Sequence, residues 1–350
     1  MTTILTVITP QHLQAWLLNV DKICKLNSNL QDLTIITVCQ SGMADEIPQL
    51  RRMLIEISRF PEYLFVINQE VTGIPEASRG SYEHALGLAT GLRSKEFQGI
   101  IYIVDPDFFI LQKNWLQSTA RYLKHSHSGY AGAMYDPSDV KQWIDFPCLH
   151  FFYFKEEKIE EFIQNLMPNL VTIDSKVKVP FRESLEKKLS SSAELGYKLR
   201  SIKINKSVFF RFQSYAFFSI IATLATYFKL KSFGRYAFIY RCLIGIGIKY
   251  LRQHQKKQGI ILVHGTTSRS HKLLNAIQKR VMPTFNFEIT NRVLVLEQQA
   301  KMDSAKSDFT LNSGIEIYML DKAPFAYHLR SFRNRFEDFD LIELEKLLLK

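Results

Sequence analysis

Two aspartates separated by one proline are the residues of this 350-residue chain that point most directly to chemistry. Asp105 and Asp107 follow an apolar run, residues 99–104, which is typical of a buried strand. Two carboxylates at the end of such a strand are costly unless they are hydrated, hydrogen-bonded or neutralised. A divalent cation neutralises them, and oxygen ligands suit Mn²⁺ or Mg²⁺, which also bridge diphosphate oxygens. The alternative interpretation is an ordinary Asp-Pro-Asp turn.

The chain around these aspartates alternates between strand and helix patterns. The predicted strands are residues 4–9, 33–39, 64–67 and 99–104, and the predicted helices are residues 10–26, 45–57 with Asp45 as the cap, and 85–92. This alternation is typical of an α/β fold with a mostly parallel sheet and helices on both faces. Ligands of such sheets bind outside the carboxyl ends of the strands, which is where the two aspartates lie.

Positive charge is concentrated in one region of the chain. The net charge is +11, and residues 195–287 contain 17 Lys or Arg and no Asp or Glu. The uncharged run 212–228 is shorter than the about 20 residues that a membrane-spanning helix needs. Two helices lying on an anionic membrane surface fit this pattern, and so does a helical subdomain buried in protein. The region lacks an RNA-binding signature and helix-turn-helix spacing, so we expect no nucleic-acid partner.

The four cysteines lie far apart and have neither zinc-site nor redox spacing. We therefore expect buried free thiols, which fit a reducing compartment. The first ten residues lack the basic segment of an export signal and have the pattern of a strand. These features favour a cytoplasmic protein, with peripheral contact to the inner face of the membrane if the basic region is interfacial.

Four stretches of the sequence resemble the GT-A-fold, family 2-like glycosyltransferases, which use nucleotide sugars. They are residues 4–39, residues 80–88, residues 101–107 with Trp115-Leu116, and residues 181–196. The Asp-x-Asp segment within 101–107 is the most specific of the four. Together they cover residues 1–206, with a return at 259–269. The resemblance implies a GT-A-like mixed sheet and an enzyme that moves a sugar from a nucleotide-diphosphate donor to an acceptor hydroxyl.

The resemblance also implies a metal site and a set of donor contacts. Asp105 and Asp107 would hold the metal, and His264, at the end of an apolar run, resembles the late histidine that completes such a site. A surface turn with an incidental histidine is the alternative for His264. Arg269 would neutralise the donor diphosphate, which Asp105 would also approach.

The resemblance places two further residues, Gln40 and His84, near the nucleotide of the donor. Gln40 stands where the family often has an acidic residue that contacts the nucleotide base, so recognition there would use an amide instead. His84 lies on the helix before the fourth strand and would approach the nucleotide. The alternative for His84 is a solvent-facing position on that helix.

The catalytic base is expected on the segment that follows. Glu183 opens a predicted helix that ends at Gly196-Tyr197, a spacing that resembles the family's catalytic carboxylate. Such a group takes the proton of the acceptor hydroxyl as the sugar is transferred. Asp174 is the second choice. The alternative for either acid is stabilisation of a helix N-terminus.

We therefore divide the chain into a GT-A-like core (1–206), a basic apolar helical insertion (207–258), a return to the core (259–287) and a C-terminal extension (288–350), in which we identify no chemistry. A lipid-linked or envelope-polysaccharide acceptor fits the basic insertion. One alternative is a catalytically silent GT-A-like scaffold that binds membrane or protein. Another is a nucleotidyltransferase, which requires a glycine-rich basic loop after the first strand, and residues 9–11 do not provide one.

Overall fold

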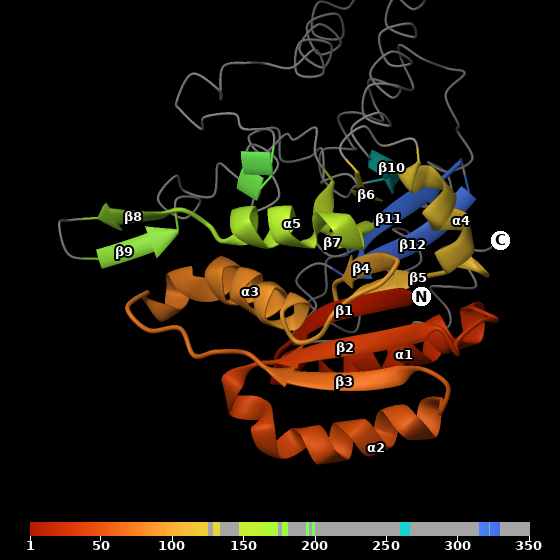
Figure 1. The fold of residues 1–350 in the computed structure, drawn as a ribbon, viewed down its shortest axis with the longest axis horizontal. Helices are drawn as coiled ribbons and strands as arrows, with labels where there is room; N and C mark the ends of the chain where they lie inside the picture. The colour runs from red at the N-terminus through yellow and green to blue at the C-terminus, as the bar shows by residue number, and fades with distance from the viewer. Residues whose placement is uncertain are drawn as a thin grey trace, which may run out of the picture.

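The computed structural model describes the chain in nine stretches (Figure 1). These are residues 1–124, 129–133, 147–173, 177–180, 194–195, 198–199, 260–266, 315–321 and 323–329. The predicted insertion 207–258 lies outside them, as do the candidate site residues Asp174, Glu183 and Arg269.

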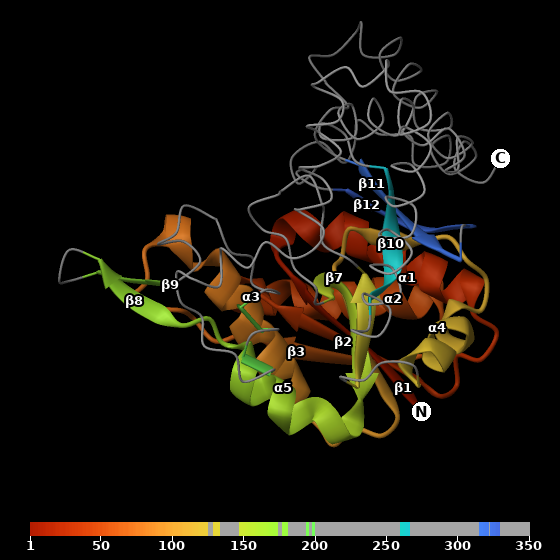
Figure 2. The same ribbon diagram turned by 90° about the horizontal axis from the view of Figure 1, so that it is seen from above.

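Within these stretches, ten strands form one sheet in the order β3-β2-β1-β4-β7-β6-β10-β11-β12-β5. The strands are β1 (Thr2–Ile8), β2 (Leu33–Cys39), β3 (Glu62–Ile67), β4 (Ile100–Val104), β5 (Phe108–Ile110), β6 (Tyr130–Ala133), β7 (Cys148–Lys155), β10 (Ile260–Thr266), β11 (Ile315–Leu320) and β12 (Ala323–Leu329). Strands β8 (Leu170–Ile173) and β9 (Val177–Pro180) form a separate hairpin that projects from the body of the molecule in both views (Figures 1 and 2).

The sheet is parallel on one side and antiparallel on the other. Strands β1, β2, β3 and β4 pair in parallel, as do β6 and β10. Strand β7 is antiparallel to β4 and β6, and the end of the sheet from β10 through β11 and β12 to β5 is antiparallel throughout. The predicted α/β fold with a mixed sheet is confirmed.

Helices cover both faces of the sheet. They are α1 (Leu13–Leu26), α2 (Ile47–Ile57), α3 (Glu76–Leu92), α4 (Trp115–Leu123) and α5 (Ile159–Leu166). One apolar core contains Trp16 of α1, Leu54 of α2 and the fully buried Trp115 of α4. The other contains Leu88 of α3 and Phe162 of α5. Helices α1 and α2, which follow β1 and β2, therefore pack on one face of the sheet, and α3, which follows β3, packs on the other. The chain then returns to pair β4 with the opposite side of β1, so the carboxyl ends of β1 and β4 border a topological switch point.

Two details near this edge differ from the sequence analysis. Asp45 does not cap a helix: it lies exposed in a 3-10 helix, Ser41–Glu46, and α2 begins at Ile47 without a side-chain cap. The amide of Ile47 already donates to the carbonyl of Ala44, and Pro48 in the first turn has no amide hydrogen, so fewer donors need a cap. The region treated as an extension contributes β11 and β12 to the sheet.

Two expectations about the chain's environment can be compared with the described residues. Cys24 and Cys39 are free thiols, as predicted, with Cys39 buried and Cys24 partly buried. Burial raises the pKa of the Cys39 thiol to about 12, so this side chain behaves as an apolar core residue. Within the stretches that the structure describes, none of the helices has the length and apolar character needed to cross a membrane.

Candidate metal and donor site

The turn after β4 places Asp105 and Asp107 at the carboxyl edge of the sheet. The amide of Phe108 donates to the carbonyl of Asp105 (3.0 Å), which closes a tight turn around Pro106 and returns the chain into β5. Two further main-chain bonds tie this turn to other strands. The amide of Asp105 donates to the carbonyl of His150 (2.9 Å), and the amide of Leu329 donates to the carbonyl of Asp107 (3.1 Å).

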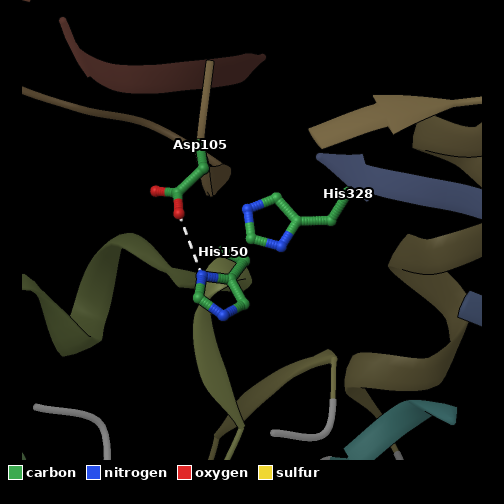
Figure 3. A group of neighbouring side chains, drawn as sticks. All are labelled: Asp105, His150 and His328. Carbon is green, nitrogen blue, oxygen red and sulfur yellow. Dashed lines mark hydrogen bonds and ion pairs between the residues drawn. The ribbon is translucent and has the colours of Figure 1, made fainter. Parts of the chain in front are cut away.

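Each aspartate consequently lies beside a histidine from a distant part of the chain. Figure 3 shows Asp105 with His150 and His328. His150 belongs to β7, where Phe151 pairs with Val104, and its Nδ1 donates to Oδ2 of Asp105 (2.9 Å). His328 belongs to β12, where it pairs with Phe108, and its Nε2 lies 3.3 Å from Oδ1 of Asp107. The register of antiparallel pairing thus brings both histidines to the turn.

Asp105, His150 and His328 form a group that can hold a metal ion. One ligand atom from each residue lies within 4.8 Å of the other two. Opposite ligands of an ion with bonds of about 2.1 Å are separated by about 4.2 Å, so small side-chain rotations are enough to bring these atoms to one ion. The two imidazole rings are stacked, with centroids 4.4 Å apart. Two imidazoles and a carboxylate fit a divalent transition metal.

The electrostatic environment keeps Asp105 ionised. Burial raises the pKa of this carboxyl, but the hydrogen bond from His150 and the charges of the protonated imidazoles around it outweigh burial and hold the pKa well below its usual range. His84 of α3 is one of those imidazoles, with its Nε2 at 3.7 Å from Oδ1 of Asp105. Asp105 is therefore available as an anionic ligand.

The structure brings some of the candidate residues together and leaves others apart. Asp105, Asp107 and His84 share one site. Gln40 directly follows β2 at the same edge of the sheet and is partly buried. Its main-chain amide donates to the carbonyl of Ile8 (3.1 Å). His264 lies in β10, where its backbone pairs with Tyr318 of β11, and its side chain is outside the described atoms.

Sequence analysis missed His150 and His328 as site residues. His150 was not among the candidate residues, and His328 fell in the extension without identified chemistry. Both are polar residues within aromatic, apolar strands, and both are largely buried. A histidine that interrupts an apolar strand was the signal that could have identified these residues. It does not reveal which side chain the histidine contacts in the folded protein.

No protein-family model matches the chain, and no curated protein matches it either. The chain does match solved structures. One is the mannosyltransferase PcManGT from Pyrobaculum calidifontis in complex with GDP-Man and Mn²⁺, 18% identical, with 46% of each chain covered and a TM-score of 0.36. The match thus spans less than half of that protein's length. Another is the galactosyltransferase LgtC with donor and acceptor sugar analogues, 8% identical, covering 56% of this chain and 70% of that one, with a TM-score of 0.38.

A third structure, residues 1–349 of TarS from S. aureus, is 11% identical, with 93% of this chain and 96% of that one covered and a TM-score of 0.38. All three TM-scores lie below 0.5, so the fold and the site described above rest on the strand order and the side-chain contacts of this chain. Two of the three matched structures are named as sugar-transferring enzymes.

Proposed function

We propose that the protein is a metal-dependent glycosyltransferase that moves a sugar from a nucleotide-diphosphate donor to an acceptor hydroxyl. The observation that supports this most is the convergence of Asp105, His150 and His328 at the carboxyl ends of the strands, beside the topological switch point. A cation-binding group at this edge suits a donor whose leaving group is a diphosphate. Gln40 and His84 at the same edge are the proposed donor contacts.

The proposed roles of the side chains follow from their positions. A divalent cation bound here would supply positive charge to the departing nucleoside diphosphate. Asp105 would hold it together with His150 and His328, while Asp107, 3.3 Å from His328, orients that imidazole or adds an oxygen ligand. The sequence-based assignments of Arg269 to the diphosphate and of Glu183 or Asp174 to the base remain part of the proposal.

The ligand set also bears on which ion is used. Mg²⁺ prefers an octahedron of oxygen atoms and keeps several waters, whereas imidazole nitrogen suits transition metals. Two of the three residues in the group are histidines. Of the two ions expected from the sequence, we therefore propose Mn²⁺.

The acceptor is proposed from charge. The residues from 195 to 287, with 17 basic and no acidic side chains, fit an anionic membrane surface, and a lipid-linked or polysaccharide acceptor would be presented there. A nucleotidyltransferase is disfavoured because β1 leads through Thr9 into a 3-10 helix, Pro10–His12, that contains neither glycine nor a basic lysine or arginine.

Paired substitutions test which late histidine completes the site. His328→Gln is expected to raise the Mn²⁺ dissociation constant at least about tenfold, because it removes a nitrogen ligand, whereas His264→Gln leaves it within about twofold. Titration of the metal-free proteins with Mn²⁺, followed by electron paramagnetic resonance, measures both. Weakened binding in His264→Gln alone would restore the sequence-based assignment and remove His328 from the site.

Donor identity is tested with the wild-type protein. GDP-Man, named with the mannosyltransferase structure, and UDP-GlcNAc, present in a second TarS structure, are the first donors to screen. A bound donor raises the melting temperature in proportion to the logarithm of its concentration, and we expect this shift only when Mn²⁺ is present.

A further inference from the structure

A buried asparagine on α1 contacts the turn that carries the two aspartates. Asn19 has no exposed surface. Its Nδ2 lies 2.9 Å from the carbonyl oxygen of Phe108 and 3.3 Å from that of Pro106. The carbonyl oxygen of Asp105 is 3.4 Å away. One side-chain amide therefore donates to the main chain along the whole turn, from the face of the sheet that α1 covers.

The orientation of this amide is fixed by its partners. If it were flipped, the oxygen of Asn19 would face three carbonyl oxygens, and none of these groups can donate. In the observed orientation Oδ1 is buried and has no hydrogen-bond partner among the described residues. A buried acceptor without a partner opposes folding, but a leucine of similar size would leave the carbonyls of Pro106 and Phe108 without this donor. The amide is therefore tied to the turn by its donor side alone.

We propose that Asn19 is a positioning residue for the metal site. The direction of a carboxylate is set by the main chain that carries it, and metal ligands must be held to within about 0.5 Å of their working positions. Strand pairing holds one end of the turn through Asp105 and the other through Asp107. Asn19 supplies a third attachment from a different layer, at Pro106 between those ends and at Phe108 directly after them. It does not touch the proposed ion; it acts through the aspartates.

This inference rests on the proposed function for the identity of the bound metal, but the attachment of Asn19 to the turn does not depend on it. Two measurements distinguish a failure of this inference from a failure of the proposed function. The Mn²⁺ dissociation constant reports on the metal site. Hydrogen exchange of the Phe108 and Leu329 amides in the metal-free protein reports on the turn, because both amides donate to its carbonyls.

The test compares Asn19→Leu with a matched substitution at the end of the same helix. Asn27 is also a buried asparagine, but its Nδ2 donates to Ile23 (2.8 Å) and its Oδ1 accepts from the amide of Leu116 (3.3 Å), away from the turn. Asn19→Leu is expected to weaken Mn²⁺ binding by about 10-fold to 100-fold, as outer partners of metal ligands do. It should also speed exchange of both reporter amides, while turnover at saturating Mn²⁺ stays within about threefold of wild type. Asn27→Leu should change neither Mn²⁺ binding nor exchange.

Asn19→Ala provides a second variant if the leucine protein does not fold, since the smaller side chain leaves room for a water donor. Wild-type Mn²⁺ affinity and wild-type exchange in a folded Asn19 variant would overturn the inference. Equal effects of the Asn19 and Asn27 substitutions would also overturn it, because they would indicate general destabilisation. If the wild type binds no Mn²⁺, the proposed function fails, and the exchange of the two amides still decides the role of Asn19.

Discussion

Replacing Asp105 with asparagine is expected to lower sugar transfer by about 10³-fold. The amide is nearly isosteric but neutral, so the site loses the anion that three imidazoles surround and that holds the proposed cation. Loss of about 4 kcal/mol of electrostatic stabilisation in the transition state corresponds to this factor. Turnover of the donor in the presence of Mn²⁺, measured for purified wild type and variant, gives the ratio.

Asp45→Asn is the matched control for this substitution. Asp45 is an exposed aspartate in the 3-10 helix that follows β2. Its replacement removes the same charge without touching the metal ligands, and activity should stay within about twofold of wild type because surface substitutions of this kind are nearly neutral. Full activity in a folded Asp105→Asn protein would remove the metal from the proposed mechanism.

Replacing Glu183 with glutamine is expected to lower transfer by about 10²-fold to 10⁴-fold, the range that general-base catalysis contributes. Donor affinity should remain at the wild-type value, because the base acts on the acceptor and only as the bond to the sugar forms. Transfer rates at saturating donor, together with donor binding by calorimetry, separate these two quantities. Asp174→Asn, measured alongside, tests the second candidate.

A folded Glu183→Gln protein with normal transfer would exclude Glu183 as the base. If Asp174→Asn alone loses transfer, the role moves to Asp174. Equal loss of donor binding and transfer in the Glu183 variant would show that this residue holds the substrate and does not act as a base.

The parallel half of the sheet could be predicted from the sequence because its signals are local. Each of β1, β2 and β3 is a short apolar run followed by a helix, β4 is the apolar run that follows the last of these helices, and such units pair in parallel through their connections. The antiparallel half could not. Strand β5 pairs with β12, so Phe108 lies beside His328 across more than two hundred residues of chain, and no local pattern specifies that register.

The site was predicted only in part for the same reason. Asp105 and Asp107 were identifiable because their charge interrupts the chain directly after an apolar strand. His150 and His328 lie within strands, where a single histidine resembles a satisfied core residue, and their meaning comes from the pairing that places them beside the aspartates. The contact of Asn19 with the turn likewise depends on packing of α1 against β5, which helical periodicity alone does not reveal.

Mn²⁺ binding to the wild-type protein, with and without nucleoside diphosphate, tests the central claim most directly. The claim is that Asp105, His150 and His328 hold a cation that binds the donor diphosphate. Titration followed by electron paramagnetic resonance should show one bound Mn²⁺ per chain, tighter when GDP or UDP is present, and no comparable binding in the His150→Gln/His328→Gln double variant. A wild-type protein that binds no Mn²⁺ under either condition, or a double variant that binds it as tightly as wild type, would contradict the account.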